Sequence, residues 1–203
     1  MQTKKDEMQK RLLEAAQKEF LEKGFKKASI RNIVKAAKTT IGNFYNYFES
    51  KEMIFSSLVD TVYKELIYFI KNHQDVDVAN QPIEQLDINF LREYLGNVAA
   101  QLVPRLNDDF LLLVECGMDT KYANVKNELI DFIGLHFFEH IESYSPNYKN
   151  IEMGRIISSQ FIHGVIEIIK KYKDTEKRQV LITEQILYTA LGVMGILQGG
   201  RND

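Results

Sequence analysis

The feature that most constrains the fold of this chain is a helical spacing of apolar residues, which recurs along almost its whole length. Over residues 8–20, apolar side chains return at intervals of three and four, which places them on one face of a helix. Proline occurs only three times, and no alternation of apolar and polar residues typical of a strand appears. The sequence therefore predicts an all-α fold.

Residues that start or stop helices divide the N-terminal part of this pattern into three helices. Gly24 is expected to stop the first helix, and Ser29 is expected to cap a second, shorter one. The hydroxyl of Thr39 or Thr40 can accept from the free N–H groups of a third helix that begins at Ile41. A helix-turn-helix arrangement is thus predicted just after the first helix.

Beyond Lys51 the predicted helices are longer than a small domain needs. Their apolar periodicity and the breaks between them predict helices over 51–73, 82–102, 108–117, 122–144, 149–172 and 176–198, with Pro82 in a first helical turn. We therefore expect two domains, a three-helix N-terminal domain over residues 1–50 and a larger helical domain over 51–203.

The charge is distributed unevenly between the two ends of the chain. Residues 1–52 hold twelve Lys or Arg and seven Asp or Glu, a formal charge of +5, whereas the remainder carries −7. A basic small domain joined to an acidic larger one suits a protein of which only one end approaches a polyanion. Charge alone does not distinguish this interpretation from a chance distribution over solvated faces.

Other features of the composition narrow the class of protein. The single cysteine, Cys116, excludes an intramolecular disulfide and a thiolate cluster for metal chemistry. The first ten residues lack the apolar run of a secretory signal, and the longest apolar stretch, 186–197, is shorter than the roughly 18 residues that a membrane span needs. We therefore expect a cytoplasmic protein with no membrane partner.

Residues 29–52 contain a set of residues at a specific spacing. The set comprises Ile33, the Ala36-Ala37 pair, Gly42, the run Phe44-Tyr45-x-Tyr47-Phe48, and Ser50-Lys51-Glu52. This segment closely resembles, without a gap, the helix-turn-helix signature of TetR-like repressors. The resemblance is detailed only in this N-terminal part, and beyond it extends to the helical layout alone. It implies a DNA-binding transcriptional regulator with a helical sensing domain.

The residues of the motif are physically suited to that role. Phe44 and Phe48 share one helical face and are expected to pack against Ile33 and Ala37. The other faces and the helix ends carry groups that can meet base edges or phosphates. We expect DNA contacts from Ser29, Lys38, Thr40, Ile41, Gly42, Asn43, Tyr45, Asn46, Tyr47 and Lys51.

Individual residues of the motif bear on the expected operator sequence and on the expected phosphate contacts. An asparagine amide can pair with adenine, and the third helix holds no arginine, so an A·T-rich operator is expected. Lys38 stands where the family usually has a glycine in the turn, so the turn is either strained by about 1 kcal/mol or reshaped, and Lys38 can add a phosphate contact. Lys51 is either a phosphate contact or a solvated helix end.

The larger domain is rich in aromatic residues that can line an apolar pocket for a small molecule. The candidate ligand-binding residues are Phe90, Tyr94, Phe110, Glu115, Met118, Tyr122, Phe132, His136, Phe137 and Phe161. Most aromatic residues at helical spacing belong to a core, so about half of this set is expected to touch a ligand. His136, Glu139 and His140 have the spacing of an inverted zinc-protease motif, but the phenylalanines between them favour a hydrogen-bonded histidine pair, and no metal is expected.

Small residues beside apolar ones in the last two predicted helices suggest a homodimer, because small side chains let two helices approach closely. The candidate interface consists of Gly154, Ser158, Phe161, Gly164, Val165, Leu191, Gly192 and Gly195. A two-fold dimer is expected to bind a near-palindromic operator.

The function that we expect is therefore a ligand-responsive, homodimeric repressor, released from double-stranded operator DNA by a small, mostly apolar effector. No nucleophile elbow, phosphate loop or dinucleotide fingerprint appears, so neither an enzyme nor a cofactor is expected. The alternative is a helical small-molecule-binding protein or enzyme whose helix-turn-helix no longer binds DNA.

Overall fold

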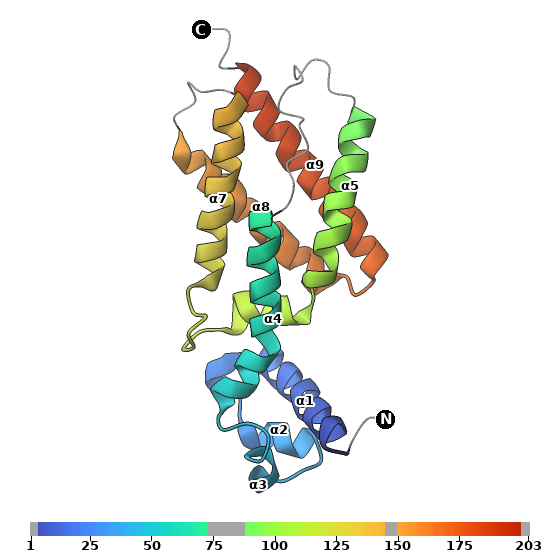
Figure 1. Ribbon diagram of the computed structural model, residues 1–203, viewed down its shortest axis with the longest axis vertical. Helices are drawn as coiled ribbons and strands as arrows, with labels where there is room; N and C mark the ends of the chain where they lie inside the picture. Colours follow the sequence, from blue (N-terminus) through green and yellow to red (C-terminus); the bar gives the residue numbers. More distant parts are fainter. Residues whose placement is uncertain (1–3, 73–87, 145–149, 200–203) are drawn as a thin grey trace. The chain divides into compact units, whose positions relative to one another are not determined.

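The computed structural model describes residues 4–72, 88–144 and 150–199, and these residues contain helices and no strand (Figure 1). The helices are α1 (Lys4–Lys27), α2 (Ile30–Ala36), α3 (Ile41–Phe44), α4 (Lys51–Asn72), α5 (Ile88–Leu102), η3 (Val103–Arg105), α6 (Asp108–Leu111), η4 (Leu112–Cys116), α7 (Val125–Tyr144), α8 (Ile151–Lys171) and α9 (Thr175–Gly199). The predicted all-α fold class is confirmed.

Most of the predicted helix bounds lie close to the observed ones where both can be compared. The third helix begins at Ile41 as expected, and the break predicted at 173–175 separates α8 from α9. The helix predicted from Pro82 is described only from Ile88, so Pro82 and the break predicted at 145–148 lie outside the described residues. The segment predicted as one helix over 108–117 is a turn of α-helix followed by a π-helix.

Packing divides the described residues into two compact units. The first unit contains the described residues up to 67 together with 105–126, and the second contains those of 68–104 and from 127 onward. The first unit thus holds the three N-terminal helices, most of α4, and the segment with α6 and η4. The domain boundary predicted at residue 50 stays a prediction.

The core of the first unit is built on three phenylalanine rings. The Phe20 ring lies 5.8 Å from that of Phe25 and 5.1 Å from that of Phe55, and all three side chains are buried. The predicted helix stop at Gly24 is confirmed, because its backbone has φ 72° and ψ 163° inside α1. This positive φ suits glycine, and the resulting break in α1 places Phe25 beside Phe55.

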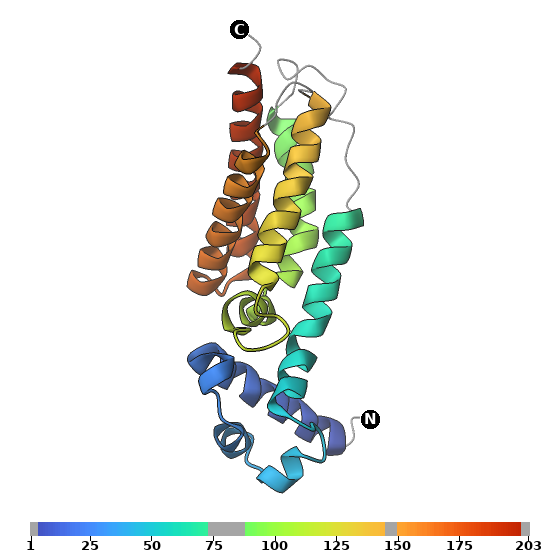
Figure 2. The ribbon, with the colours of Figure 1, turned by 90° about the vertical axis from the view of Figure 1, so that its left-hand side faces the viewer.

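The second unit is a bundle of helices in which α9 packs against both α5 and α8 (Figure 2). Helices α7 and α8 cross closely at Gly134 and Gly154, where a Cβ on either glycine would meet backbone of the other helix. The buried hydroxyl of Ser158 donates to the carbonyl oxygen of Ile130 at 2.7 Å across the same pair. Among the described helices, none is long and apolar enough to cross a membrane.

Candidate nucleic-acid interface

Helices α2 and α3 are held together by the apolar residues that the sequence predicts to be core. The exposed fraction of the side chains is 0% for Ile33 and Phe44 and 3% for Ala37 and Phe48. These two helices contact each other, and α2 also contacts α1. The predicted burial of both phenylalanines is confirmed, so the remaining faces of α3 are set by this packing.

The turn between α2 and α3 contains a non-glycine residue in the left-handed region. Lys38 has φ 52°, so of the two expected alternatives the turn is strained and not reshaped, and its side chain is exposed. The next residue returns to the helix, because the Thr39 N–H donates to the Val34 carbonyl oxygen at 2.9 Å. A lysine in this conformation costs roughly 1–2 kcal/mol relative to a right-handed one.

The two short helices are capped in different ways. Thr40 is the N-cap of α3, and its hydroxyl accepts from the Asn43 N–H at 3.2 Å, as predicted. Ser29 holds the N-cap position of α2, but its side chain makes no capping bond, so that prediction is wrong. A carboxylate from α1 lies beside this position, where Glu19 Oε1 accepts from the Ser29 N–H at 3.1 Å and from the side-chain amide of Asn32 at 2.9 Å.

The face of α3 that points away from the core carries the predicted DNA-binding residues. Ile41 is 41% exposed and Tyr45 is 53% exposed, so both side chains are accessible to a partner. The remaining predicted residues on α3 and beside it are Thr40, Gly42 and Asn46, which are exposed, and Asn43 and Tyr47, which are half-buried. A Cβ on Gly42 would have nothing within 4 Å among the described residues, so a partner can approach the backbone there closely.

Three side chains at this face form a hydrogen-bonded chain that the sequence did not reveal. Asn43 Nδ2 donates to Thr39 Oγ1 at 2.8 Å, and Asn46 Nδ2 donates to Asn43 Oδ1 at 3.3 Å. The pair spacing of three and four residues could have suggested such bonds on one helical face. The bonds link the two amides, so the orientation of one depends on that of the other.

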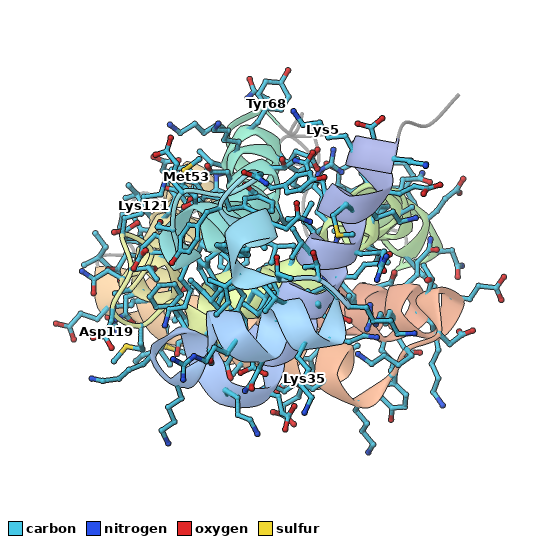
Figure 3. The ribbon with its side chains drawn as sticks, turned by 90° about the horizontal axis from the view of Figure 1, so that it is seen from below. Lys5, Lys35, Met53, Tyr68, Asp119 and Lys121 are labelled. Carbon is cyan, nitrogen blue, oxygen red and sulfur yellow. The ribbon has the colours of Figure 1, made fainter. Side chains whose placement is uncertain are left out.

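Exposed cations border the same face. Arg31 and Lys35 lie on α2 and Lys38 lies in the turn, and all three are exposed (Lys35 is labelled in Figure 3). Within the described part of the chain, none of the three has a carboxylate within ion-pair distance. The sequence analysis missed Arg31 and Lys35, although their spacing of four residues places them on one helical face.

Lys51, predicted as a phosphate contact or a solvated helix end, has partners within its own unit. Its ammonium group donates to the carbonyl oxygens of Phe25 at 2.8 Å and Ala28 at 3.1 Å, and it lies 4.4 Å from the centroid of the Phe25 ring. These carbonyls belong to the last turn of α1 and the residue after it. The predicted phosphate contact stays a prediction, and it competes with these bonds.

The candidate ligand-binding residues are divided between the two compact units. Phe110, Glu115, Met118 and Tyr122 belong to the first unit, and Phe90, Tyr94, Phe132, His136, Phe137 and Phe161 belong to the second. Phe90 is 48% exposed and Met118 is 67% exposed, whereas Phe110 is 1% exposed. Phe137 and Phe161 pack edge to face with ring centroids 6.4 Å apart. Which of these residues touch a ligand stays a prediction.

Tyr122 has a defined polar partner in the first unit. Its phenol donates a hydrogen bond to Asp60 of α4, and Lys121 lies 3.4 Å from the same carboxylate. Burial, together with the bond to Asp60, raises the pKa of the Tyr122 phenol. Glu115 is paired with Lys126 at 2.8 Å. His136 lies 3.8 Å from Glu139, and among the described residues no three potential metal ligands come together.

The predicted dimer residues on α8 require a correction, because they are used in packing within the chain. Gly154 and Ser158 pack against α7, as described above, and Gly164 accommodates the side-chain amide of Gln185 from α9. Phe161 is 9% exposed and Val165 is 1% exposed in the single chain. Four of these five residues are buried and Gly164 is half-buried, so they offer little surface to a partner.

The predicted dimer residues on α9 are different, because they remain at the surface. Leu191 is 42% exposed, and a Cβ on Gly192 or Gly195 would have nothing within 4 Å. Further large apolar side chains are exposed in the same pair of helices and were not predicted, among them Ile156 at 51% and Tyr188 at 78%. Their exposure could not be foreseen from the sequence, which does not show which face of α8 or α9 lies against its neighbours.

Comparison with known proteins places the N-terminal helices in a family. Residues 12–58 match the model of bacterial regulatory proteins of the tetR family. An uncharacterized HTH-type transcriptional regulator of Bacillus subtilis, YdgC, is 49% identical over 59 residues, which are 29% of this chain and 30% of the relative. The HTH-type transcriptional repressor DhaR of Mycobacterium sp. is 30% identical over 79 residues, 39% of either protein.

The fold beyond the N-terminal helices is also similar to a solved structure. A TetR-like transcriptional regulator from Rhodococcus sp. RHA1 superposes with a TM-score of 0.55 and 15% identity, over 91% of this chain and 96% of that one. The curated relatives match over less than half of their length, so they inform the N-terminal part alone. Residues 12–58 are thus similar in sequence to bacterial regulatory proteins of the tetR family, and the all-α fold of the described residues is similar to that of a TetR-like regulator.

Proposed function

We propose that this chain is a ligand-responsive, DNA-binding transcriptional regulator, acting in the cytoplasm as a homodimeric repressor that a small, mostly apolar effector releases from its operator. The observation that carries the proposal is the exposed face of α3, bordered by cations that have no carboxylate partner among the described residues. Exposed apolar and amide groups beside unpaired cations suit a surface that meets bases and phosphates together.

In the proposed complex, α3 enters the major groove of duplex DNA. Ile41 and the amides of Asn43 and Asn46 supply groups for base edges, and the lack of arginine on α3 favours A·T-rich sites. Phosphates are contacted by the hydroxyls and cations around it. The proposed phosphate contacts are Ser29, Lys38, Thr40, Tyr45, Tyr47 and Lys51 from the sequence, to which the structure adds Arg31 and Lys35.

Dimerisation is proposed through the exposed surface of the last two helices. Ile156, Tyr188 and Leu191 are large, apolar and exposed, and Gly192 and Gly195 leave open space for the close approach of a second copy. An interface between two identical chains is two-fold symmetric. A two-fold dimer presents its two α3 helices to half-sites about 34–36 Å apart, so the operator is a near-palindrome.

The proposed effector binds among the aromatic residues of the helices that follow α4. Residues 51–67 of α4 belong to the first compact unit and its last turn to the second, so α4 connects the two along the chain. A ligand that shifts α4 changes how the two DNA-binding units of a dimer are presented. Thermodynamic linkage then requires that the ligand bind the DNA complex more weakly than the DNA-free protein, with a coupling free energy of about 1–3 kcal/mol.

Selection of duplexes from a randomised pool tests the proposal without knowledge of the operator. The full chain is expected to enrich a near-palindromic, A·T-rich sequence, and a mobility shift with this sequence should weaken steeply as salt rises. A pool with no enriched sequence would favour the alternative, a helical binding protein or enzyme. Calorimetry of apolar effector candidates, with and without the selected duplex, then tests ligand response, because equal affinity in both states contradicts coupling.

A further inference from the structure

The side chains of Thr39, Asn43 and Asn46 form a hydrogen-bonded chain whose two end residues keep unused donors or acceptors. Asn43 Nδ2 donates to Thr39 Oγ1, which leaves the hydroxyl proton of Thr39 to donate elsewhere. Asn46 Nδ2 uses one N–H on Asn43 Oδ1, which leaves its second N–H and its carbonyl oxygen. Within residues 4–72, 88–144 and 150–199, no group bonds to the Thr39 proton or to Asn46 Oδ1.

Both open ends lie where the proposed function places DNA. Asn46 is exposed beside Tyr45, which is 53% exposed. Thr39 is half-buried and adjoins Lys38, an exposed cation without a carboxylate partner among the described residues, and Thr40, whose hydroxyl caps α3. The Thr39 end is therefore next to groups suited to a phosphate, and at the other end the exposed Asn46 amide is itself suited to a base edge.

The same three side chains can bond in either of two directions, because a hydroxyl both donates and accepts and an amide can turn over. In the observed direction, Asn46 presents one N–H and a free carbonyl oxygen. In the reverse direction, Thr39 donates to Asn43, Asn43 donates to Asn46 Oδ1, and Asn46 presents two N–H groups. The direction of the chain thus decides which hydrogen-bond pattern Asn46 offers.

We propose that a DNA phosphate bound at Thr39 fixes the observed direction, and that Asn46 thereby reads adenine in preference to guanine. A phosphate oxygen only accepts, so Thr39 must donate outward and can only accept from Asn43, which turns the Asn43 oxygen toward Asn46. Asn46 then matches adenine, which presents the N7 acceptor and the N6 donor, and not guanine, which presents two acceptors. Hydrogen bonds aligned in one direction also strengthen each other.

This inference rests on the proposed DNA-binding function and divides the roles of the three residues. Asn46 is the specificity-determining residue, whereas Thr39 and Asn43 are positioning residues that act through it. The sequence analysis assigned base contacts to both asparagines and none to Thr39. The division predicts that removing the Thr39 hydroxyl changes base preference at a position that Thr39 does not touch.

The test uses the full chain and duplexes selected from a randomised pool by the wild-type protein. The adenine position lost on selection with Asn46→Ala is identified, and affinities are measured for duplexes with A·T or G·C there. The wild type is expected to prefer A·T by roughly 5-fold to 150-fold, the equivalent of 1–3 kcal/mol. Thr39→Val should reduce this ratio toward that of Asn46→Ala, whereas Thr39→Ser, which keeps the hydroxyl, should preserve it.

A double variant separates action through Asn46 from independent action. The preference for A·T over G·C in Thr39→Val/Asn46→Ala should equal that in Asn46→Ala alone. In this relay, the hydrogen-bonded series from Thr39 through Asn43 to Asn46, Thr39 affects base preference only through the Asn46 amide, which both variants lack. A wild-type ratio in Thr39→Val, or an undiminished effect of Thr39→Val in the Asn46→Ala background, would overturn the relay while leaving DNA binding intact. Failure of the wild type to select any sequence would overturn the DNA-binding function together with the relay.

Discussion

The ammonium group of Lys51, at the start of α4, donates to the backbone carbonyl of Phe25 at 2.8 Å and lies 4.4 Å from the centroid of that residue's ring. Through these contacts the first turn of α4 holds the end of α1, just before the chain enters α2. The carbonyls at the end of a helix have no partner within the helix, so a cation placed there satisfies them and opposes the negative end of the helix dipole.

Replacement of Lys51 by methionine is expected to destabilise the protein by about 2 kcal/mol, because the hydrogen bonds from the charged ammonium group to the Phe25 and Ala28 carbonyls are lost. Urea unfolding followed by circular dichroism measures this loss. Lys35→Met is the control, since Lys35 is an exposed helical lysine without such bonds, and its change should stay within about 0.5 kcal/mol. A Lys51→Met protein of unchanged stability, with a salt slope of DNA binding lower by about one, would instead assign Lys51 to a phosphate.

Replacement of Lys38 by glycine is expected to change the stability of the protein in a direction set by the backbone conformation of this residue. Because its φ is 52°, Lys38→Gly is expected to stabilise the protein by about 1 kcal/mol, even though glycine usually destabilises. Lys35→Gly, the same replacement in the helical backbone of α2, should destabilise by a similar amount. Thermal unfolding of both variants measures the contrast. Destabilisation by Lys38→Gly would mean that the lysine side chain stabilises the turn by more than its conformation costs.

A pH dependence is expected from Asp109, whose Oδ1 accepts from Gln17 Nε2 at 2.7 Å. Burial raises the pKa of the Asp109 carboxyl, aided by the charge of Asp108 and opposed by the Gln17 bond. The folded protein therefore binds this proton more tightly than the unfolded chain, so the contribution of Asp109 to stability falls as pH rises above about 3.9.

Asp109→Asn removes this titration and keeps an oxygen for Gln17. Its unfolding free energy, measured in urea from pH 4 to pH 7, should exceed that of the wild type by an amount that grows with pH and then levels off. A difference between the two proteins that is constant over this range, or that shrinks as pH rises, would contradict the raised pKa.

The revised dimer surface gives an expectation about assembly. Tyr188→Glu and Leu191→Glu should each convert the dimer to a monomer in light scattering, because a charge would be buried against the second copy. Tyr68→Glu, at a side chain 70% exposed on α4, is the matched control and should remain dimeric. A wild-type monomer at working concentration would refute the dimer itself, and dimeric glutamate variants would refute this face.

Local signals in the sequence were sufficient for the helices and for much of the DNA-binding face. Thr40, one of the two predicted candidates, caps α3, and the left-handed Lys38 is one of the two alternatives predicted for the turn. Caps and turns depend on residues within a few positions of each other. The cap of α2 was predicted wrongly, since the Ser29 side chain makes no capping bond. The Ser29 N–H instead donates to Glu19 of α1, a contact between two helices that local signals do not show.

Predictions that depend on which faces of two helices meet were the least successful. Gly154 and Gly164 were assigned to a dimer because small residues allow close approach, and the sequence does not tell an intrachain neighbour from a second chain. Gly154 in fact meets Gly134, and Gly164 meets Gln185. The bonds of Lys51 and the chain from Thr39 to Asn46 were missed for a similar reason, since they depend on side-chain orientations that periodicity does not fix.

The central claim, that α3 reads DNA, is tested most directly by fluorescence anisotropy with the selected duplex and a scrambled duplex of equal composition, each titrated at several salt concentrations. The account predicts that the selected duplex binds on the order of 10³-fold or more tightly than the scrambled one at physiological salt. The logarithm of both affinities should fall linearly with the logarithm of salt concentration. Asn46→Ala should reduce the ratio and leave binding to the scrambled duplex unchanged. Equal affinity for the two duplexes, or no binding to either, would contradict the account.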